Sequence, residues 1–120
     1  MDSTLDPVET QLQAYNTRDL EGFLHCFTLN CVVEDGDGQQ LMAGTAEMRE
    51  RYRALFDGSP ELHCTIFSRI RIGEHVIDEE QITGRLGTPR GERRRAVAIY
   101  KIQGNKICHV RFYRSAQKWG

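Results

Sequence analysis

The sequence lacks several features that would place it in a specialised class of protein. Its longest apolar stretches span only a few residues, so none is long enough to cross a membrane. The opening MDSTLDPVET is acidic and has no apolar stretch of the kind that signal peptides carry. The formal net charge is −1, which argues against a surface built for nucleic acid. We therefore expect a cytoplasmic protein with neither a membrane nor a nucleic acid as its partner.

Patterns typical of metal sites and disulfide frameworks are also missing. The four cysteines, Cys26, Cys31, Cys64 and Cys108, are far apart and form no C-x-x-C pair. The four histidines show no spacing typical of metal ligands. We expect reduced thiols that act mostly as small apolar core residues, and we predict no metal and no other cofactor.

The length and composition are those of one ordinary globular domain over residues 1–120. The chain is 39% apolar and 28% charged, and 120 residues are enough to enclose one core. No repeat, linker or low-complexity segment divides it.

The first half has the spacing of helices. The pair Asp6-Pro7 predicts the start of a helix whose apolar stripe is Val8, Leu12 and Tyr15. Asp19 predicts the cap of a second, short helix. Its apolar face would be Leu20, Phe23, Leu24 and Phe27. A third helix is expected from Thr45 as its capping residue, ending in the turn cluster 57–60. Its buried face would be Met48, Tyr52, Leu55 and Phe56.

The second half alternates between apolar and polar residues, as strands do. The expected strands are 29–33, 62–72, 75–84, 95–102 and 106–113. Three helices followed by a meander of four strands predict an α+β fold, with one curved sheet wrapped on the helices. The loop 85–94 (RLGTPRGERR) is basic; it contacts an anionic partner or is simply solvated.

Strands 62–72 and 75–84 are expected to form a hairpin through Gly73-Glu74. A two-residue turn there pairs Arg69 with Asp78, an ordinary cross-strand ion pair worth a few tenths to about 1 kcal/mol.

The same register predicts which hairpin residues share an apolar face. It places Ile66 opposite Gln81 and puts Ile77, Glu79 and Gln81 on the face that carries Cys64. Buried acids are rare unless they are paired or functional, so this face is a candidate pocket wall. The alternative for Glu79 is an ion pair with an arginine at the sheet rim.

Several strings of the sequence resemble those of the nuclear transport factor 2-like superfamily, in its SnoaL-like and steroid delta-isomerase-like branch. The strings are AYNTRDLEGFLHCF, VVEDGDGQQLMAGTAEMRERY, RIRIGEHVIDEEQITG, AIYKI and KICHVRF. The resemblance implies a conical half-barrel, in which one strongly curved, mainly antiparallel sheet wraps around three N-terminal helices and encloses an apolar pocket. It also implies a homodimer through the outer sheet face and a small apolar molecule in the pocket.

Compared with ketosteroid isomerases, the resemblance implies a partial catalytic site. Asp35 matches their proton-shuttling aspartate, and Tyr52 matches a tyrosine that supports the oxyanion hole. Gln11 and Ala98 stand where that family has its two oxyanion donors, so ketosteroid isomerase activity itself is not expected. The alternative for Asp35 is a turn residue at a strand end.

The resemblance also implies a set of pocket-lining residues, for whose aromatic members plain core packing is the alternative. The set is Tyr15, Tyr52, Phe56, Ile77, Glu79, Gln81, Ala98, Val110 and Phe112. In scytalone dehydratases a Tyr-Asp pair stands where this chain has Tyr15-Asn16, so the tyrosine is kept and the acid is not. His63 and Trp119 receive no assigned role.

Two functional hypotheses follow. In the first, the chain is a cofactor-independent isomerase, cyclase or lyase, in which Asp35 removes a proton α to the carbonyl of an apolar substrate. Tyr52, with Glu79 or Gln81, would then stabilise the enolate. In the second, the chain is a non-catalytic ligand-binding or dimerisation module.

Overall fold

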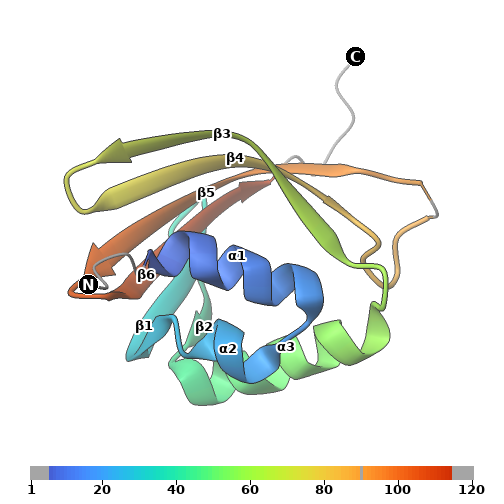
Figure 1. The fold of residues 1–120 in the computed structure, drawn as a ribbon, viewed down its shortest axis with the longest axis horizontal. Helices are drawn as coiled ribbons and strands as arrows, with labels where there is room; N and C mark the ends of the chain where they lie inside the picture. Colours follow the sequence, from blue (N-terminus) through green and yellow to red (C-terminus); the bar gives the residue numbers. More distant parts are fainter. Residues whose placement is uncertain (1–5, 90, 115–120) are drawn as a thin grey trace.

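The computed structural model of the chain describes residues 6–89 and 91–114. Six strands form one strongly curved sheet in the order β2-β1-β6-β5-β4-β3. Three helices lie against its concave face, so the α+β half-barrel expected from the sequence is confirmed (Figure 1). Within the described residues, no helix combines the length and apolar character needed to cross a membrane.

The helices begin where capping groups satisfy their first backbone N–H groups. α1 (Pro7–Thr17) is capped by Asp6, whose carboxylate accepts from the N–H of Val8 at 3.1 Å. α2 (Leu20–Leu24) is capped by Asp19, as predicted. α3 (Thr45–Gly58) begins at Thr45, the residue predicted to cap it, and its cap is Gly44 instead. The Glu47 carboxylate accepts from the N–H of Ala43 and so closes this helix start.

The sheet has one strand more than expected, and β1, β5 and β6 are longer than predicted, whereas β3 and β4 are each one residue shorter. The strands are β1 (Phe27–Asp35), β2 (Gln40–Ala43), β3 (His63–Ile72), β4 (His75–Thr83), β5 (Arg94–Gln103) and β6 (Lys106–Arg114). β2 was not predicted, and Phe27 begins β1 instead of continuing α2. All neighbouring strands are antiparallel except β1 and β6, which are parallel.

A β-bulge in β3 decides which residues of the hairpin face inward. Ser68 lies opposite Glu79, whereas Ile66 lies opposite Glu80, so Phe67 is one residue too many for a regular ladder. The expectation that Ile66 faces Gln81 is therefore wrong. Arg69 does lie opposite Asp78, as predicted.

Because side chains alternate along a strand, the bulge also reverses the predicted faces of β4. Val76, Asp78 and Glu80 point inward and are buried. Ile77, Glu79 and Gln81 lie on the other face of β4 and are only partly buried. The core between sheet and helices is centred on Phe23, whose ring packs within 4.5 Å of Tyr52 and 5.7 Å of Phe56, centroid to centroid.

Candidate ligand pocket

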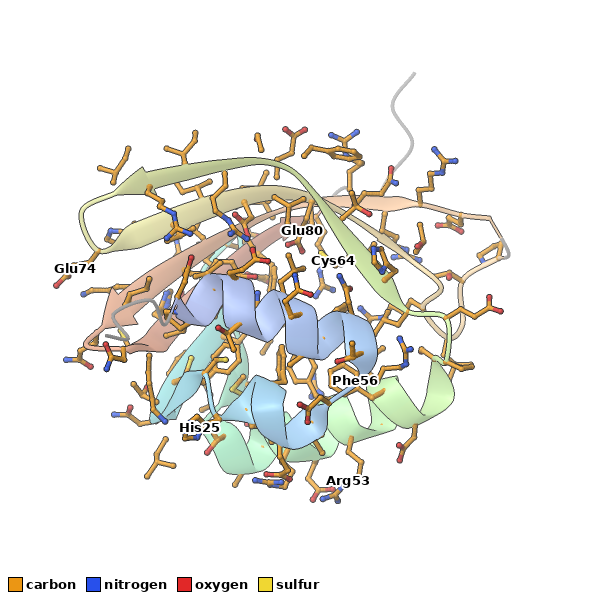
Figure 2. All side chains as sticks on the ribbon, in the orientation of Figure 1. His25, Arg53, Phe56, Cys64, Glu74 and Glu80 are labelled. Carbon is orange, nitrogen blue, oxygen red and sulfur yellow. The ribbon has the colours of Figure 1, made fainter. Side chains whose placement is uncertain are left out.

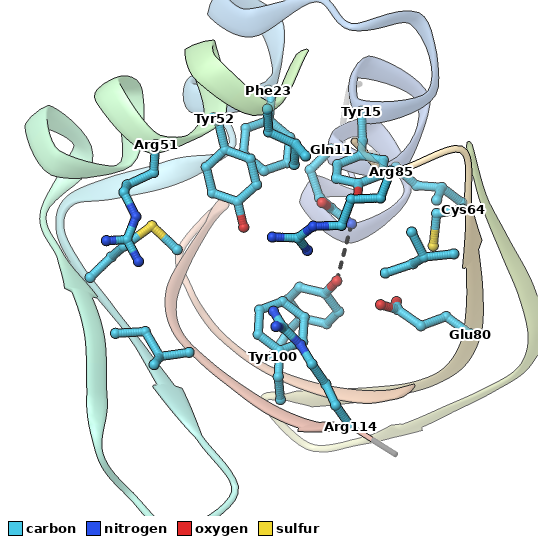
Figure 3. Close-up of a pocket in the computed structure, with 16 residues that line it drawn as sticks. Gln11, Tyr15, Phe23, Arg51, Tyr52, Cys64, Glu80, Arg85, Tyr100 and Arg114 are labelled. Atoms are coloured by element: carbon cyan, nitrogen blue, oxygen red, sulfur yellow. Dashed lines mark hydrogen bonds between the residues drawn. The ribbon is translucent and has the colours of Figure 1, made fainter. Parts of the chain in front are cut away.

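A cavity of about 210 Å³ lies between the concave sheet face and the helices α1 and α3 (Figure 3). Its wall combines aromatic rings, apolar side chains, one carboxyl group and three arginines. The lining residues are Gln11, Leu12, Tyr15, Phe23, Leu41, Met42, Arg51, Tyr52, Leu55, Cys64, Glu80, Ile82, Arg85, Tyr100, Phe112 and Arg114. A volume of this size suits a small organic molecule.

Glu80 is the acid of the pocket. Its side chain projects from β4 toward the helices, next to Cys64, and the residue is only 4% exposed (Figure 2). Burial and the neighbouring Asp78 raise the pKa of Glu80 to about 7, although the Cys64 thiol and Arg114 oppose this shift. Ala96 lies opposite Glu80 on β5, and its small side chain leaves room for the carboxyl group.

Asp78, the second inward acid of β4, is fully buried and already paired. Its two oxygens accept from Arg69, at 2.6 Å from Nε and 3.0 Å from Nη2. The guanidinium also donates to Glu9 of α1 at 2.9 Å, so this ion pair joins helix and sheet. Asp78 is thus committed to a structural contact, whereas Glu80 forms no salt bridge with another described residue.

Three tyrosine hydroxyls surround the cavity. Burial raises the pKa of Tyr52 to about 12 and also raises those of Tyr15 and Tyr100 well above the ordinary value of 10, so all three stay protonated at neutral pH. The Tyr100 hydroxyl accepts a hydrogen bond from Nε2 of Gln11 at 3.4 Å. Each tyrosine therefore keeps a proton to donate to a ligand oxygen.

Asn16, next to Tyr15 in the sequence, holds helix α1 against β3. The Asn16 amide donates to the backbone oxygen of Cys64 at 3.0 Å and accepts from the Cys64 N–H at 2.7 Å. This pair of bonds fixes the distance between α1 and β3, and with it the width of the cavity. The role of Asn16 is therefore structural.

Arg85 and Arg114 direct their guanidinium groups into the cavity from opposite walls (Figure 3). Arg85 follows β4, and Arg114 ends β6, where its guanidinium carbon lies 5.3 Å from the centre of the Phe112 ring. Neither forms an ion pair with any other residue that the structure describes. Both add positive charge to a cavity whose deeper wall carries Glu80.

A second cavity, of about 190 Å³, adjoins the first. Ile82, Arg85 and Arg114 belong to the walls of both cavities. The rest of the second wall comes from the loop after β4 and from the start of β5, and its residues are Leu86, Gly87, Thr88, Arg94, Arg95 and Ala96.

The loop that carries Arg85 is fixed at its base. Gly84 has a φ of +75°, and a Cβ there would lie 2.1 Å from the backbone oxygen of Glu61. The backbone N–H of Leu86 donates to the buried hydroxyl of Ser59 at 2.8 Å. These contacts hold the residues on both sides of Arg85 against the end of α3.

The residues proposed from the sequence as pocket lining fall into three groups. Tyr15, Tyr52 and Phe112 line the cavity. Phe56, Ala98 and Val110 are buried in the core beside it.

Ile77, Glu79 and Gln81 do not line the cavity, because the bulge at Phe67 places them on the outer face. Glu79 is instead paired with Arg95 at the sheet rim, the alternative considered from the sequence.

Asp35 does not line the cavity either. It lies opposite Phe112 in the sheet, but one carboxylate oxygen accepts from the backbone N–H groups of Asp37 and Gln39, both at 2.9 Å. These bonds close the turn between β1 and β2, which is the structural role considered for this residue. The proposed contact of Asp35 with a pocket ligand is thus corrected.

The sequence reasoning missed Glu80, Arg85, Tyr100 and Arg114 as pocket residues. The adjacent acids Glu79 and Glu80 carried a usable signal, because one of two neighbouring strand residues must face inward. Of the residues left without a role, His63 is exposed, and Trp119 lies outside the described residues. No group of three metal-binding side chains occurs in the described part of the chain.

Solved structures of other proteins share the fold of this chain. No curated protein matches this chain. A cystatin-fold protein from Novosphingobium aromaticivorans, itself uncharacterized, is 25% identical, with a TM-score of 0.81 over 88% of this chain and 93% of that chain. A protein with a ketosteroid isomerase-like fold from Catenulispora acidiphila, solved in complex with trimethylamine, is 20% identical, with a TM-score of 0.77 over 92% and 85% of the two chains.

An epoxide hydrolase of M. tuberculosis, described as LEH-like, is also similar in structure. It is 16% identical, with a TM-score of 0.78 over 91% of this chain and 80% of that chain. The sequence model of the SnoaL-like domain matches residues 8–110. The half-barrel, its order of helices and strands and this match agree, and the chain belongs to the SnoaL-like domain family of the nuclear transport factor 2-like fold.

Proposed function

We propose that this protein binds a small carbonyl compound in the 210 Å³ cavity and catalyses proton transfer on it, with Glu80 as the general base. The observation that carries the proposal is the buried carboxyl group of Glu80, whose pKa is raised to about 7 in a cavity wall. A base with such a pKa is partly ionised at neutral pH and accepts and returns protons efficiently.

The chemistry requires a carbon acid and a place for the charge that develops. Glu80 would take a proton from the carbon next to the carbonyl, and the C–H electron pair would move to the carbonyl oxygen, giving an enolate. Tyr15 and Tyr52 are the candidate donors to that oxygen, since their hydroxyls remain protonated. Return of the proton to a different carbon completes an isomerisation.

The structural relative from M. tuberculosis is described as an LEH-like epoxide hydrolase, so this fold carries an enzyme in at least one protein. Asp35, the base proposed from the sequence, is not used here, because its carboxylate is engaged in the β1–β2 turn.

The proposal is tested by hydrogen–deuterium exchange in D₂O. A panel of aliphatic and aromatic ketones, including 4-acetylbenzamide, is incubated with the protein, and loss of the α-proton is followed by NMR. Wild type and the matched acid variant Asp35→Asn should exchange at similar rates, whereas Glu80→Gln should lose the protein-dependent rate. The wild-type rate should rise with pH through about 7, where Glu80 ionises.

Equal exchange in wild type and Glu80→Gln, or no exchange above buffer for any ketone, would refute catalysis by Glu80. A second candidate function, ligand binding without catalysis, would then remain. It is favoured by Gln11 and Ala98, which by the family resemblance replace the oxyanion donors of ketosteroid isomerases. Thermal stabilisation by the same ketones, unchanged in Glu80→Gln, would support it.

A further inference from the structure

We infer that Arg85 and Arg114 form an anion-binding site in the wall shared by the two cavities, so that the ligand carries a carboxylate or a phosphate ester. This inference rests on the proposed function only in placing the ligand in the same cavity. Its chemistry is independent of Glu80 as a base.

The first argument is the convergence of the two side chains. They come from positions 29 residues apart in the chain, at the end of β6 and after β4, yet both line both cavities. In Figure 3 the two guanidinium groups approach the cavity from opposite walls. Two guanidinium forks directed at one space form a site for an oxyanion with two or more acceptor atoms.

The second argument is the pairing of the neighbouring arginines. The other two arginines of the second cavity have acidic partners, since Arg95 is paired with Glu79 and Arg94 with Glu92 at 3.5 Å. Arg85 and Arg114 have none among the described residues. Among the arginines of the second cavity, the positive charge left for a ligand is thus concentrated at Arg85 and Arg114, the two that this cavity shares with the first.

The third argument is the position of Arg114 relative to Glu80. Ala96 lies opposite Glu80 on one side and opposite Arg114 on the other, so the three form one row across β4, β5 and β6. Arg114 is separated from the acid by one strand, β5, and does not pair with it; its guanidinium lies near the ring of Phe112 instead. A ligand anchored at Arg114 would therefore have its next atoms beside Glu80.

The fourth argument is that the backbone on both sides of Arg85 is fixed. Gly84 packs against the backbone oxygen of Glu61, and the N–H of Leu86 donates to Ser59, both near the end of α3. Binding an anion at Arg85 therefore requires less ordering of the loop than binding at a mobile segment would.

The test uses three probes that share one ketone scaffold: 4-acetylbenzoate, 4-acetylphenyl phosphate and neutral 4-acetylbenzamide. Dissociation constants are measured by calorimetry or NMR titration for wild type, Arg85→Gln, Arg114→Gln and Arg93→Gln. Arg93 is the matched control, because it is an exposed arginine of the same loop that lines neither cavity. Thermal unfolding verifies that each variant is folded.

We expect at least one anion to bind about tenfold more tightly than the amide, the size of one charge-assisted hydrogen bond. Arg85→Gln and Arg114→Gln should remove this preference, and Arg93→Gln should keep it. Arg85→Lys should retain part of it, because the charge stays while the fork is lost. The dissociation constants of the benzoate and the phosphate, compared with each other, show which oxyanion the site prefers.

Equal affinities for the amide and both anions would overturn the inference, as would an equal loss of affinity in Arg93→Gln. The titrations are repeated with Glu80→Gln. Anion preference that persists there, without deuterium exchange in wild type, supports the anion site and refutes the catalytic proposal. Deuterium exchange in wild type without anion preference supports the catalytic proposal and refutes the anion site.

Discussion

Arg69 and Asp78 form a two-pronged ion pair across β3 and β4, and the carboxylate is completely buried under α1. The sequence predicted this pair as an ordinary cross-strand ion pair worth at most about 1 kcal/mol. Its burial changes the energetics, because removing one partner leaves an uncompensated charge in the interior. We expect Arg69→Met to lower the free energy of unfolding by about 3–5 kcal/mol, measured by denaturant unfolding.

The double variant Arg69→Met/Asp78→Leu should recover most of this loss, because no buried charge remains. Arg53→Met is the surface control, since Arg53 pairs with Glu50 at 3.6 Å on the exposed side of α3 and points away from the molecule (Figure 2). That variant should change stability by less than about 0.5 kcal/mol. An equally small effect of Arg69→Met would contradict the structural role of the pair.

Glu80 should make stability depend on pH near neutrality. Its pKa is about 7 in the folded protein and near the ordinary 4.5 in the unfolded chain, so the folded state binds more protons between these values. The free energy of unfolding should therefore fall as pH rises from about 4.5 to about 7, by roughly 3 kcal/mol from this group.

Glu80→Gln should remove that part of the pH dependence and be more stable than wild type at pH 8. The comparison is made by urea unfolding at a series of pH values, and Glu79→Gln serves as the control, because it removes the neighbouring acid on the outer face of β4. Parallel curves for wild type and Glu80→Gln would show that Glu80 titrates normally.

Gly84 should tolerate no side chain. Its positive φ and the short approach to the backbone oxygen of Glu61 both act against a Cβ. We expect Gly84→Ala to cost at least about 1–3 kcal/mol of stability and to weaken binding of the anionic probe by displacing Arg85. Gly91→Ala is the control, because its φ is also positive at +83° but a Cβ there meets nothing within 4 Å. Similar losses in both variants would mean that backbone strain alone, not the contact with Glu61, limits position 84.

The homodimer implied by the family resemblance remains a prediction, and the outer sheet face offers a surface for it. Ile70, Ile77 and Ile99 lie opposite one another in a row across three strands, and Ile70 is 51% exposed. Apolar rows of this kind are typical of interfaces. Sedimentation analysis should find a dimer for wild type and a monomer for Ile70→Glu, whereas Leu29→Glu, at an exposed leucine of β1, should stay dimeric. A monomeric wild type would exclude this interface.

Sequence patterns predicted the helices and most strands because their signals are local. Asp6, Asp19 and the stripe through Val8 and Leu12 act within one or two turns of helix, and the structure has helices at these positions. β2 was missed because its four residues lie between glycines and carry too short a pattern.

The candidate pocket was predicted less well, for a physical reason. A bulge adds one residue to a strand without a distinct sequence signal, and the face of every residue beyond it is then assigned wrongly. Because the extra residue Phe67 was not foreseen, the predicted pocket wall contained Glu79, whereas the structure has Glu80 there. Arg85 and Arg114 could not be found by periodicity, because one follows a strand and the other ends one.

The row formed by Glu80, Ala96 and Arg114 links recognition to reactivity. Arg114 holds down the pKa of Glu80 by its positive charge. A bound oxyanion would neutralise that charge and leave the Glu80 carboxylate a stronger proton acceptor. An anionic ligand would in this way make Glu80 more basic toward itself, whereas a neutral analogue of the same shape would leave Glu80 less basic.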